Sequence, residues 1–251
     1  MQMSIEIQEQ FRGPPRSGNG GYVTGVIAGL LMEGKRAPDA AEVTLRAPVP
    51  LDRALSVNGD NACIRVMDDE TLIAEALRTS LILEVPEPAT FEEAQSARDA
   101  SASLRVSEHR AFKGQRRVGI HPVCFCCGAE LAADAGLHVY AAPIPARRQV
   151  AAAWIAPEAY SNPDGTLPEA IVCTALDCPG QFAWLAEGKR TGMLGRMTPC
   201  IKQSVRAGEQ CVVIGWTMGN EGRKHFAGTA LFNERRELCA YAKAVWIGRK
   251  N

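Results

Sequence analysis

Residues 17–33, SGNGGYVTGVIAGLLME, form the stretch on which the interpretation of the fold depends. After its glycine-rich start, two rows of apolar residues recur at every fourth position, which is the periodicity of a helix. The rows are Tyr22, Val26 and Leu30, and Val23, Ile27 and Leu31. The spacing therefore predicts a helix over residues 22–33, preceded by a glycine-rich turn.

A third row of this helix consists of Gly21, Gly25 and Gly29. A glycine inside a helix costs ~1 kcal/mol relative to alanine, so three of them weaken the helix. Close packing against another backbone segment would offset that cost, because glycine has no side chain to keep the two backbones apart. We therefore expect such a contact, and we expect Gly34 to end the helix.

The rest of the first half is predicted to be extended. A short strand at 5–11 precedes the helix, and strands at 42–47, 62–67 and 72–83 follow it. A connecting helix is expected at 90–102, and a basic surface linker at 108–120.

The second half repeats this order. Strands are predicted at 138–142 and 149–155, followed by a helix at 167–185 that Pro179-Gly180 interrupts. Four further strands are predicted at 193–205, 211–218, 225–232 and 238–247. Each half thus consists of a strand, a helix and an antiparallel meander, which predicts a sheet wrapped around a helix, present twice.

The composition excludes several classes of function. The 251 residues contain 28 Lys and Arg and 28 Asp and Glu, so the chain lacks the excess positive charge of generic nucleic-acid binders or polybasic membrane proteins. The longest apolar stretch, 23–32, is too short to span a membrane. Residues 1–11 do not resemble a signal peptide, so we expect a cytoplasmic protein with nine reduced cysteines, and the Ala- and Arg-rich usage favours a bacterial source.

Four segments resemble a known family: Phe11–Val23, Val43–Leu51, His121–Gly128 and Ala175–Gly180. The first two are similar to the opening of the first helix and to the first long strand of the double-hotdog acyl-CoA thioesterases. The other two are similar to segments of an uncharacterised bacterial branch of that superfamily. The resemblance covers most of the chain and is more specific for fold than for activity.

This resemblance implies the fold class and the domain boundaries. The expected fold is α+β, a double hotdog of two antiparallel sheets that each wrap around a central helix. Residues 1–88 would form the N-terminal hotdog and 131–251 the C-terminal hotdog. Residues 89–130 would form a linker that holds the connecting helix and the CFCCG loop.

The resemblance also implies catalytic residues. Asp177 matches the helix aspartate of the double-hotdog thioesterases, where it would orient the water that attacks the thioester. Its neighbours in the sequence are apolar, and burial among them would raise its pKa, which suits a general base near neutral pH. The alternative is that Asp177 caps a helix segment beside Pro179-Gly180.

The family pairs this aspartate with a hydroxyl residue and a glutamine. Thr198 lies in the region that would supply the hydroxyl. The strand that would supply the glutamine, 241–246, contains none. Water activation by that arrangement is therefore in doubt.

Backbone N–H groups at the start of the first helix would hold the thioester carbonyl, because the first turn of a helix has unpaired donors. Gly18, Asn19, Gly20 and Gly21 are the residues predicted to bind substrate in this way. The alternative is an ordinary helix entrance with Asn19 as its N-cap.

The cysteine cluster has several interpretations. Cys124 and Cys127 form a C-x-x-C pair, with Cys126 between them, and one such pair supplies half of a zinc site. A four-cysteine site would need the later pair, Cys173 and Cys178, to meet it. We interpret these residues as buried thiols, because a free cysteine behaves as a small hydrophobic residue, and we expect neither a metal nor a cofactor.

The expected function is hydrolysis of acyl thioesters, with a coenzyme A ester as the small-molecule partner. The alternative is a non-catalytic module of the same fold that binds acyl-CoA or lipid, which the absent glutamine favours. A hydratase or dehydratase and a zinc-dependent interaction module are weaker alternatives. A monomer and a homodimer of double-hotdog units fit the sequence equally.

Overall fold

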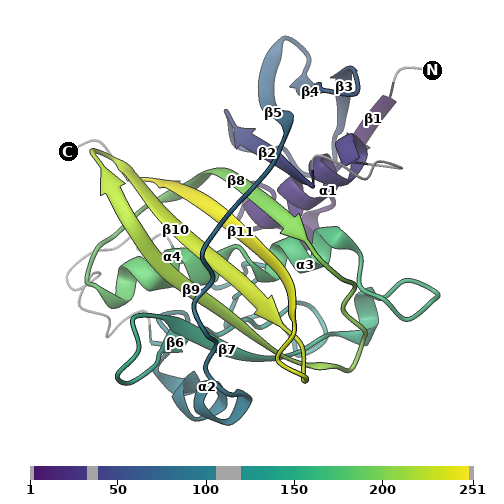
Figure 1. The fold of residues 1–251 in the computed structure, drawn as a ribbon. Helices are drawn as coiled ribbons and strands as arrows, with labels where there is room; N and C mark the ends of the chain where they lie inside the picture. Colours follow the sequence, from purple (N-terminus) through teal and green to yellow (C-terminus); the bar gives the residue numbers. More distant parts are fainter. Residues whose placement is uncertain (1–2, 33–38, 106–119, 249–251) are drawn as a thin grey trace.

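The computed structural model describes residues 3–32, 39–105 and 120–248. In these ranges the strands form one antiparallel sheet of eleven, in the order β1-β3-β4-β5-β2-β8-β11-β10-β9-β7-β6 (Figure 1). The strands are β1 (Met3–Glu6), β2 (Ala40–Leu45), β3 (Ala54–Gly59), β4 (Cys63–Asp68), β5 (Thr71–Thr79), β6 (Ala142–Pro143), β7 (Val150–Ile155), β8 (Met193–Ile201), β9 (Gln210–Glu221), β10 (Lys224–Phe232) and β11 (Leu238–Ile247).

The two halves of the chain have the same strand order. The first half runs β1-β3-β4-β5-β2, and the second runs β7-β9-β10-β11-β8 with β6 added at the edge. Along the chain, α1 (Gly20–Met32) lies between β1 and β2, and the helical segment of the second half lies between β7 and β8. These are the two outermost strands of each half in the order above. The predicted repeat of strand, helix and antiparallel strands is therefore present.

The prediction of two separate sheets is wrong, because β2 and β8 join the halves edge to edge. The pairing is short, with Val43 opposite Met197 and Thr44 opposite Arg196. Side chains extend this joint, since the Arg196 Nε donates a hydrogen bond to the Thr44 Oγ1 at 2.9 Å and Arg196 forms an ion pair with Glu42.

The helix of the first half, α1 (Gly20–Met32), packs against β2 and β5 and against α3 (Glu169–Ala175) of the second half. A Cβ atom on Gly21 would lie 2.5 Å from the Cys173 carbonyl oxygen, and one on Gly25 would lie 2.5 Å from the Ala170 Cα. The expected close approach to another backbone is confirmed at these two glycines. Gly29 has open space around it instead.

The helix of the second half is interrupted three residues earlier than predicted. It consists of α3 and α4 (Cys178–Ala186), and the break falls at Leu176 and Asp177. Pro179 lies in the first turn of α4, where the lack of an N–H group costs nothing because the first N–H groups of a helix have no partner within it. Asp177 consequently occupies the N-cap position of α4, where the chain turns.

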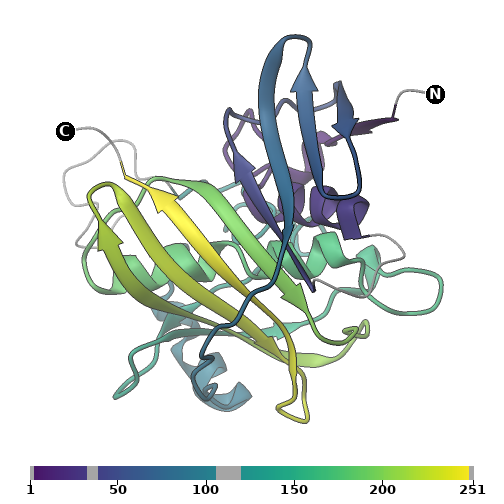
Figure 2. The same ribbon diagram turned by 45° about the horizontal axis from the view of Figure 1, so that its top comes forward.

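Residues 80–90, which we call the strap, cross the outer face of the C-terminal strands and lead into α2 (Phe91–Ala97) (Figures 1 and 2). On this face Leu81 and Leu83 of the strap pack in one cluster with Phe232 and Tyr241. The Tyr241 hydroxyl donates a hydrogen bond to the Leu81 carbonyl oxygen at 2.8 Å. The strap and α2 therefore belong to the core of the second half.

Most of the other predicted elements differ mainly at their ends, but the strand predicted at 138–142 is wrong. Only Ala142 of that segment lies in a strand, at the start of β6. The backbone before it instead forms hydrogen bonds with the loop at 120–127, such as the one from the Val139 N–H to the Cys126 carbonyl oxygen.

Residues 5–11 form the end of β1 and a 3-10 turn, Glu9–Phe11, and β3 was not predicted. Its sequence ALSVNG buries only Leu55 and Val57. Two alternating apolar residues are too few to distinguish a strand from a loop by sequence pattern. Gly34 and most of the expected linker at 108–120 lie outside the described residues.

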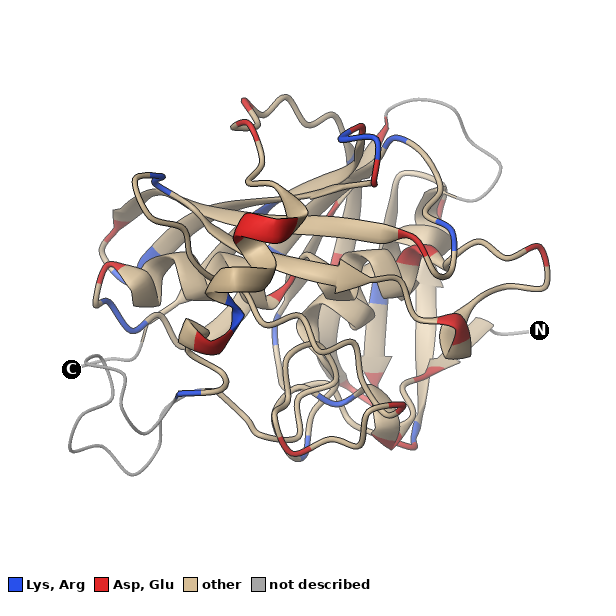
Figure 3. Ribbon diagram, turned by 90° about the horizontal axis from the view of Figure 1, so that it is seen from below, with Lys and Arg blue, Asp and Glu red and all other residues tan. Residues whose placement is uncertain are grey.

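Charged residues are spread over the molecule. Viewed from below, acidic and basic segments are interspersed and neither sign gathers on one side (Figure 3). Many form ion pairs, such as Arg53 with Asp68 and Asp69.

Among the described residues, no helix is long and apolar enough to cross a membrane.

Candidate active site

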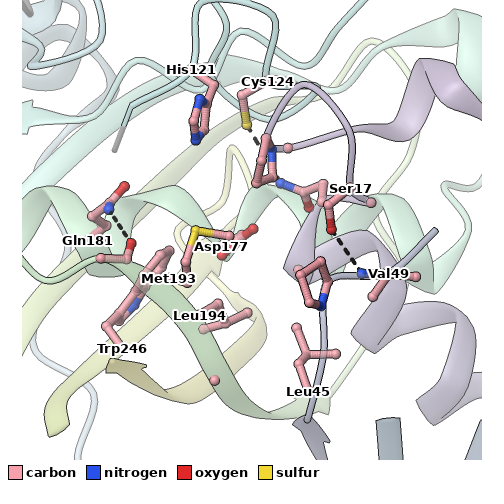
Figure 4. Close-up of a pocket in the computed structure, with 18 of the residues that line it drawn as sticks. Ser17, Leu45, Val49, His121, Cys124, Asp177, Gln181, Met193, Leu194 and Trp246 are labelled. Carbon is pink, nitrogen blue, oxygen red and sulfur yellow. Dashed lines mark hydrogen bonds between the residues drawn. The ribbon is translucent and has the colours of Figure 1, made fainter. Parts of the chain in front are cut away.

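A cavity of about 260 Å³ lies where the two halves meet (Figure 4). Its wall contains residues from the loop before α1 (13–20), the end of β2 and the loop after it (45–49), the cysteine loop (120–127), the start of α4 (177–181), the start of β8 (192–195) and the end of β11 (246–247). Both halves and the segment between them therefore contribute to one site.

The N-terminal ends of α1 and α4 meet at this cavity. The Gly21 N–H donates a hydrogen bond to the Asp177 Oδ2 at 3.1 Å. Asn19 is the N-cap of α1, since its Oδ1 accepts a hydrogen bond from the Tyr22 N–H at 2.9 Å. The N–H of Gly20, which lines the cavity, makes no hydrogen bond within the described part of the chain. One donor at the positive end of α1 is therefore left for a bound molecule.

Asp177 is 3% exposed and lines the cavity. Burial raises the pKa of its carboxyl group to about 7, and the nearby Cys124 acts in the same direction, whereas the Gly21 N–H and the Asn19 side chain act in the opposite one. The Asp177 Oδ1 has no hydrogen-bond partner among the described residues. This oxygen can accept a proton or a hydrogen bond from a molecule in the cavity.

Two further residues of the cavity wall were missed by the sequence reasoning. Gln181 lies one turn after Asp177 on the same face of α4, and its Nε2 donates to the Gly192 carbonyl oxygen at 3.0 Å. The i, i+4 spacing from Asp177 indicates that it shares a helix face with this residue. The family resemblance instead places the glutamine on the last strand, so Gln181 was not predicted. The Trp246 Nε1 lies on β11, and no described residue accepts a hydrogen bond from it.

Of the other predicted site residues, Gly18 lines the cavity and Thr198 does not. Gly18 lines the cavity, but its N–H donates to the Val49 carbonyl oxygen at 3.0 Å and is not available to substrate. Thr198 lies on β8 opposite Lys243, and it is not among the cavity-lining residues of the described chain. Its role as the catalytic hydroxyl stays a prediction.

His121 and Cys124 approach the cavity from the cysteine loop, across from Asp177 and Gln181 on α4 (Figure 4). Burial lowers the pKa of the His121 imidazole, which favours its neutral form. A neutral imidazole can both donate and accept a hydrogen bond.

Three thiols meet at the cavity wall. The Sγ of Cys178 lies 3.1 Å from that of Cys127 and 3.8 Å from that of Cys124. Cys173 does not join them, because it lies on α3 against Gly25. All the cysteines are free thiols.

Comparisons with known proteins identify the fold. The sequence matches no protein family and no curated protein. Among solved structures, a TesB protein of Mycobacterium avium subspecies paratuberculosis is similar over 98% of this chain and 92% of its own, with a TM-score of 0.60 and 13% identity.

Two further structures are similar over nearly the whole chain. A protein of Novosphingobium aromaticivorans with a provisional thioesterase assignment matches 98% of this chain and 95% of its own, with a TM-score of 0.56 and 11% identity. A hotdog-fold protein of unknown function from Alicyclobacillus acidocaldarius matches 100% and 94%, with a TM-score of 0.53 and 11% identity. The chain therefore has the hotdog fold of thioesterase-like proteins.

Proposed function

We propose that this chain hydrolyses acyl thioesters and that the Asp177 carboxylate holds the attacking water. One observation carries the proposal: a buried carboxylate has an unpaired oxygen, Oδ1, in a cavity where two helix N-termini meet. The thioesterase assignments of the TesB and Novosphingobium proteins of the same fold favour this chemistry.

The proposed reaction uses two groups of the chain. Asp177 accepts a proton from water through Oδ1 while the water oxygen attacks the thioester carbonyl carbon. The negative charge that develops on the carbonyl oxygen is stabilised by the Gly20 N–H at the positive end of α1, and one such donor is worth about 3–4 kcal/mol in other enzymes. The C–S bond then breaks, and the thiolate of the leaving group takes up the proton.

In this proposal Gly21 does not bind the substrate carbonyl. Its N–H is already engaged by the Asp177 Oδ2, so it holds the carboxylate in place. Because Oδ2 is fixed in this way, the carboxylate keeps one orientation in the cavity wall.

The substrate is proposed to be a coenzyme A ester with a short acyl group. The part of the cavity near Leu45, Val49 and Leu194 is apolar and suits an acyl chain. At about 260 Å³ the cavity is smaller than the ~300–1,000 Å³ pockets that enclose a drug-sized ligand, so the bulk of coenzyme A would lie outside it.

A second candidate is a module that binds acyl thioesters without hydrolysing them. Two observations favour it: the strand β11 contains no glutamine, and Thr198 is not part of the cavity wall. The residues that the family resemblance implies for water activation are therefore incomplete.

A hydrolysis assay with Asp177→Asn distinguishes the two candidates. Purified protein is incubated with short, medium and long acyl-CoA esters, and free coenzyme A is measured by chromatography, so that the protein's own thiols do not interfere. We expect turnover with the shorter esters and a loss of roughly 100-fold or more in kcat for Asp177→Asn, because general-base catalysis typically contributes about 10²–10⁴-fold.

Asp164→Asn is the matched control, since this aspartate lies in an exposed turn outside the cavity and should leave the rate unchanged. Unchanged turnover in a folded Asp177→Asn protein would exclude Asp177 as the base. Ester binding with no turnover by the wild-type protein, detected as a thermal shift, would favour the binding module.

A further inference from the structure

We propose that Cys124, Cys127 and Cys178 bind a zinc ion through their thiolates at the wall of the cavity. The three Sγ atoms lie within 4.8 Å of one another, and all three residues are buried. The proposal is independent of whether Asp177 acts as a base.

The spacing of the sulfur atoms suits tetrahedral coordination. Zinc–sulfur bonds of about 2.3 Å place two sulfurs of a tetrahedron roughly 3.8 Å apart. The Cys124 and Cys178 sulfurs are 3.8 Å apart and those of Cys127 and Cys178 are 3.1 Å apart. The Cys124–Cys178 pair already has this separation, and the Cys127–Cys178 pair would have to widen by about 0.7 Å to reach it.

The cluster joins two parts of the chain that are far apart in sequence. Cys124 and Cys127 come from the cysteine loop, and Cys178 is the first residue of α4. Residues 120–128 form no helix or strand, and backbone hydrogen bonds such as Phe125 N–H to the Arg12 carbonyl oxygen hold this loop to other loops rather than to α4. A shared ion would fix the loop against α4.

The neighbouring thiols and burial raise the pKa of all three cysteines, so a bound metal ion would have to displace their protons. Two contacts would stabilise the thiolates once the metal is bound. The Asn19 Nδ2 donates toward the Cys124 Sγ at 3.7 Å, and such donors around a site orient metal ligands. Cys178 lies at the positive N-terminal end of α4, which stabilises a thiolate. Neither contact is needed by three inert buried thiols.

The ligand set selects the metal. Thiolates are soft ligands that prefer zinc over magnesium or calcium, which prefer oxygen. Three protein ligands leave the fourth tetrahedral position unfilled, as in catalytic zinc sites rather than closed structural ones. Since Cys124, Cys127 and Cys178 all line the cavity, that position faces a molecule bound there.

The primary test is the zinc content of the purified full-length chain. The protein is reconstituted with zinc under reducing conditions, dialysed, and measured by elemental mass spectrometry and native intact mass. We expect one zinc per chain in the wild-type protein and loss of zinc in Cys124→Ser, Cys127→Ser and Cys178→Ser. Cys173→Ser is the matched control, because this buried cysteine lies outside the trio. The variant should therefore retain one zinc per chain.

A second measurement covers the case in which the serine variants fail to fold. Cobalt replaces zinc in the wild-type chain, and thiolate ligation gives an intense sulfur-to-cobalt absorption band in the near ultraviolet. Asp177→Asn should keep this band even where hydrolysis is lost, so the two proposals can fail separately.

Three results would overturn the proposal. They are no zinc in the reconstituted wild-type protein, retention of zinc by all three folded serine variants, and a mass lower by two hydrogen atoms. The last result would show a disulfide, and peptide mapping that places it between two of Cys124, Cys127 and Cys178 would show that the trio pairs covalently instead.

Discussion

At the scale of single residues, the sequence predicts the burial of the candidate catalytic side chain better than it predicts its partners. Apolar neighbours correctly indicated that Asp177 is buried. Its hydrogen bond to the Gly21 N–H joins residues 156 positions apart and depends on the packing of α1 against α3. Similarly, Cys178 rather than Cys173 completes the thiol trio, because the helix breaks at Asp177 and only Cys178 lies beyond the break.

Asp177→Asn should separate function from stability. A buried carboxylate oxygen without a partner costs about 1–3 kcal/mol, and an amide of the same shape removes the charge while it can still accept the Gly21 hydrogen bond. We therefore expect the variant to melt at the same temperature as the wild type or higher, measured at neutral pH by circular dichroism. A clearly lower melting temperature would indicate that Asp177 serves mainly as a helix cap.

At the scale of elements, the pattern of apolar residues predicted both long helical segments and most of the strands, but it missed β3 and did not place the break in the second helical segment. Pro179-Gly180 suggested a break at that position, yet proline is accommodated in the first turn of α4 and the break comes earlier. The position of the break depends on the contact between α3 and α1, which local propensity does not contain. The strand β11, in contrast, was predicted with its observed bounds because its charged turn and alternating residues are local signals.

Alanine substitutions along the glycine row should have opposite effects. In Gly25→Ala the new Cβ would lie 2.5 Å from the Ala170 Cα, and because this is backbone α3 must shift, at a cost of about 1–3 kcal/mol. In Gly29→Ala the Cβ meets open space, so the better helix propensity should raise the free energy of unfolding by up to ~1 kcal/mol. Urea denaturation of both variants measures this, and equal effects would contradict the packing described for α1 and α3.

At the scale of the molecule, the repeated strand order was predictable from the repeated order of strand, helix and meander. The union of both halves into one sheet was not, because it depends on two residue pairs between β2 and β8. Most of the strap was assigned to the N-terminal hotdog, and residues 80–83 to the end of its last strand, whereas Leu81 and Leu83 pack on the second half. The apolar face that they cover forms only when β10 and β11 pair, so the sequence alone does not show it.

We expect the two halves to unfold together, because they share a sheet, a helix pair and the strap. The four tryptophans, at 154, 184, 216 and 246, all lie in the second half, so their fluorescence reports on that half alone. Far-ultraviolet circular dichroism reports on both halves. Coincident urea transitions by the two methods are the expected result. An earlier loss of circular dichroism would show that the first half unfolds independently.

The strap also has a consequence for assembly. Ala230, Phe232 and Tyr241 present apolar surface on the outer face of the C-terminal strands, and this surface would be exposed if the strap did not lie across it. The strap covers it from within the same chain, as a partner subunit would cover it in an oligomer. Association of two copies must therefore bury a different surface, and a chain that lost its strap would expose an apolar face prone to self-association.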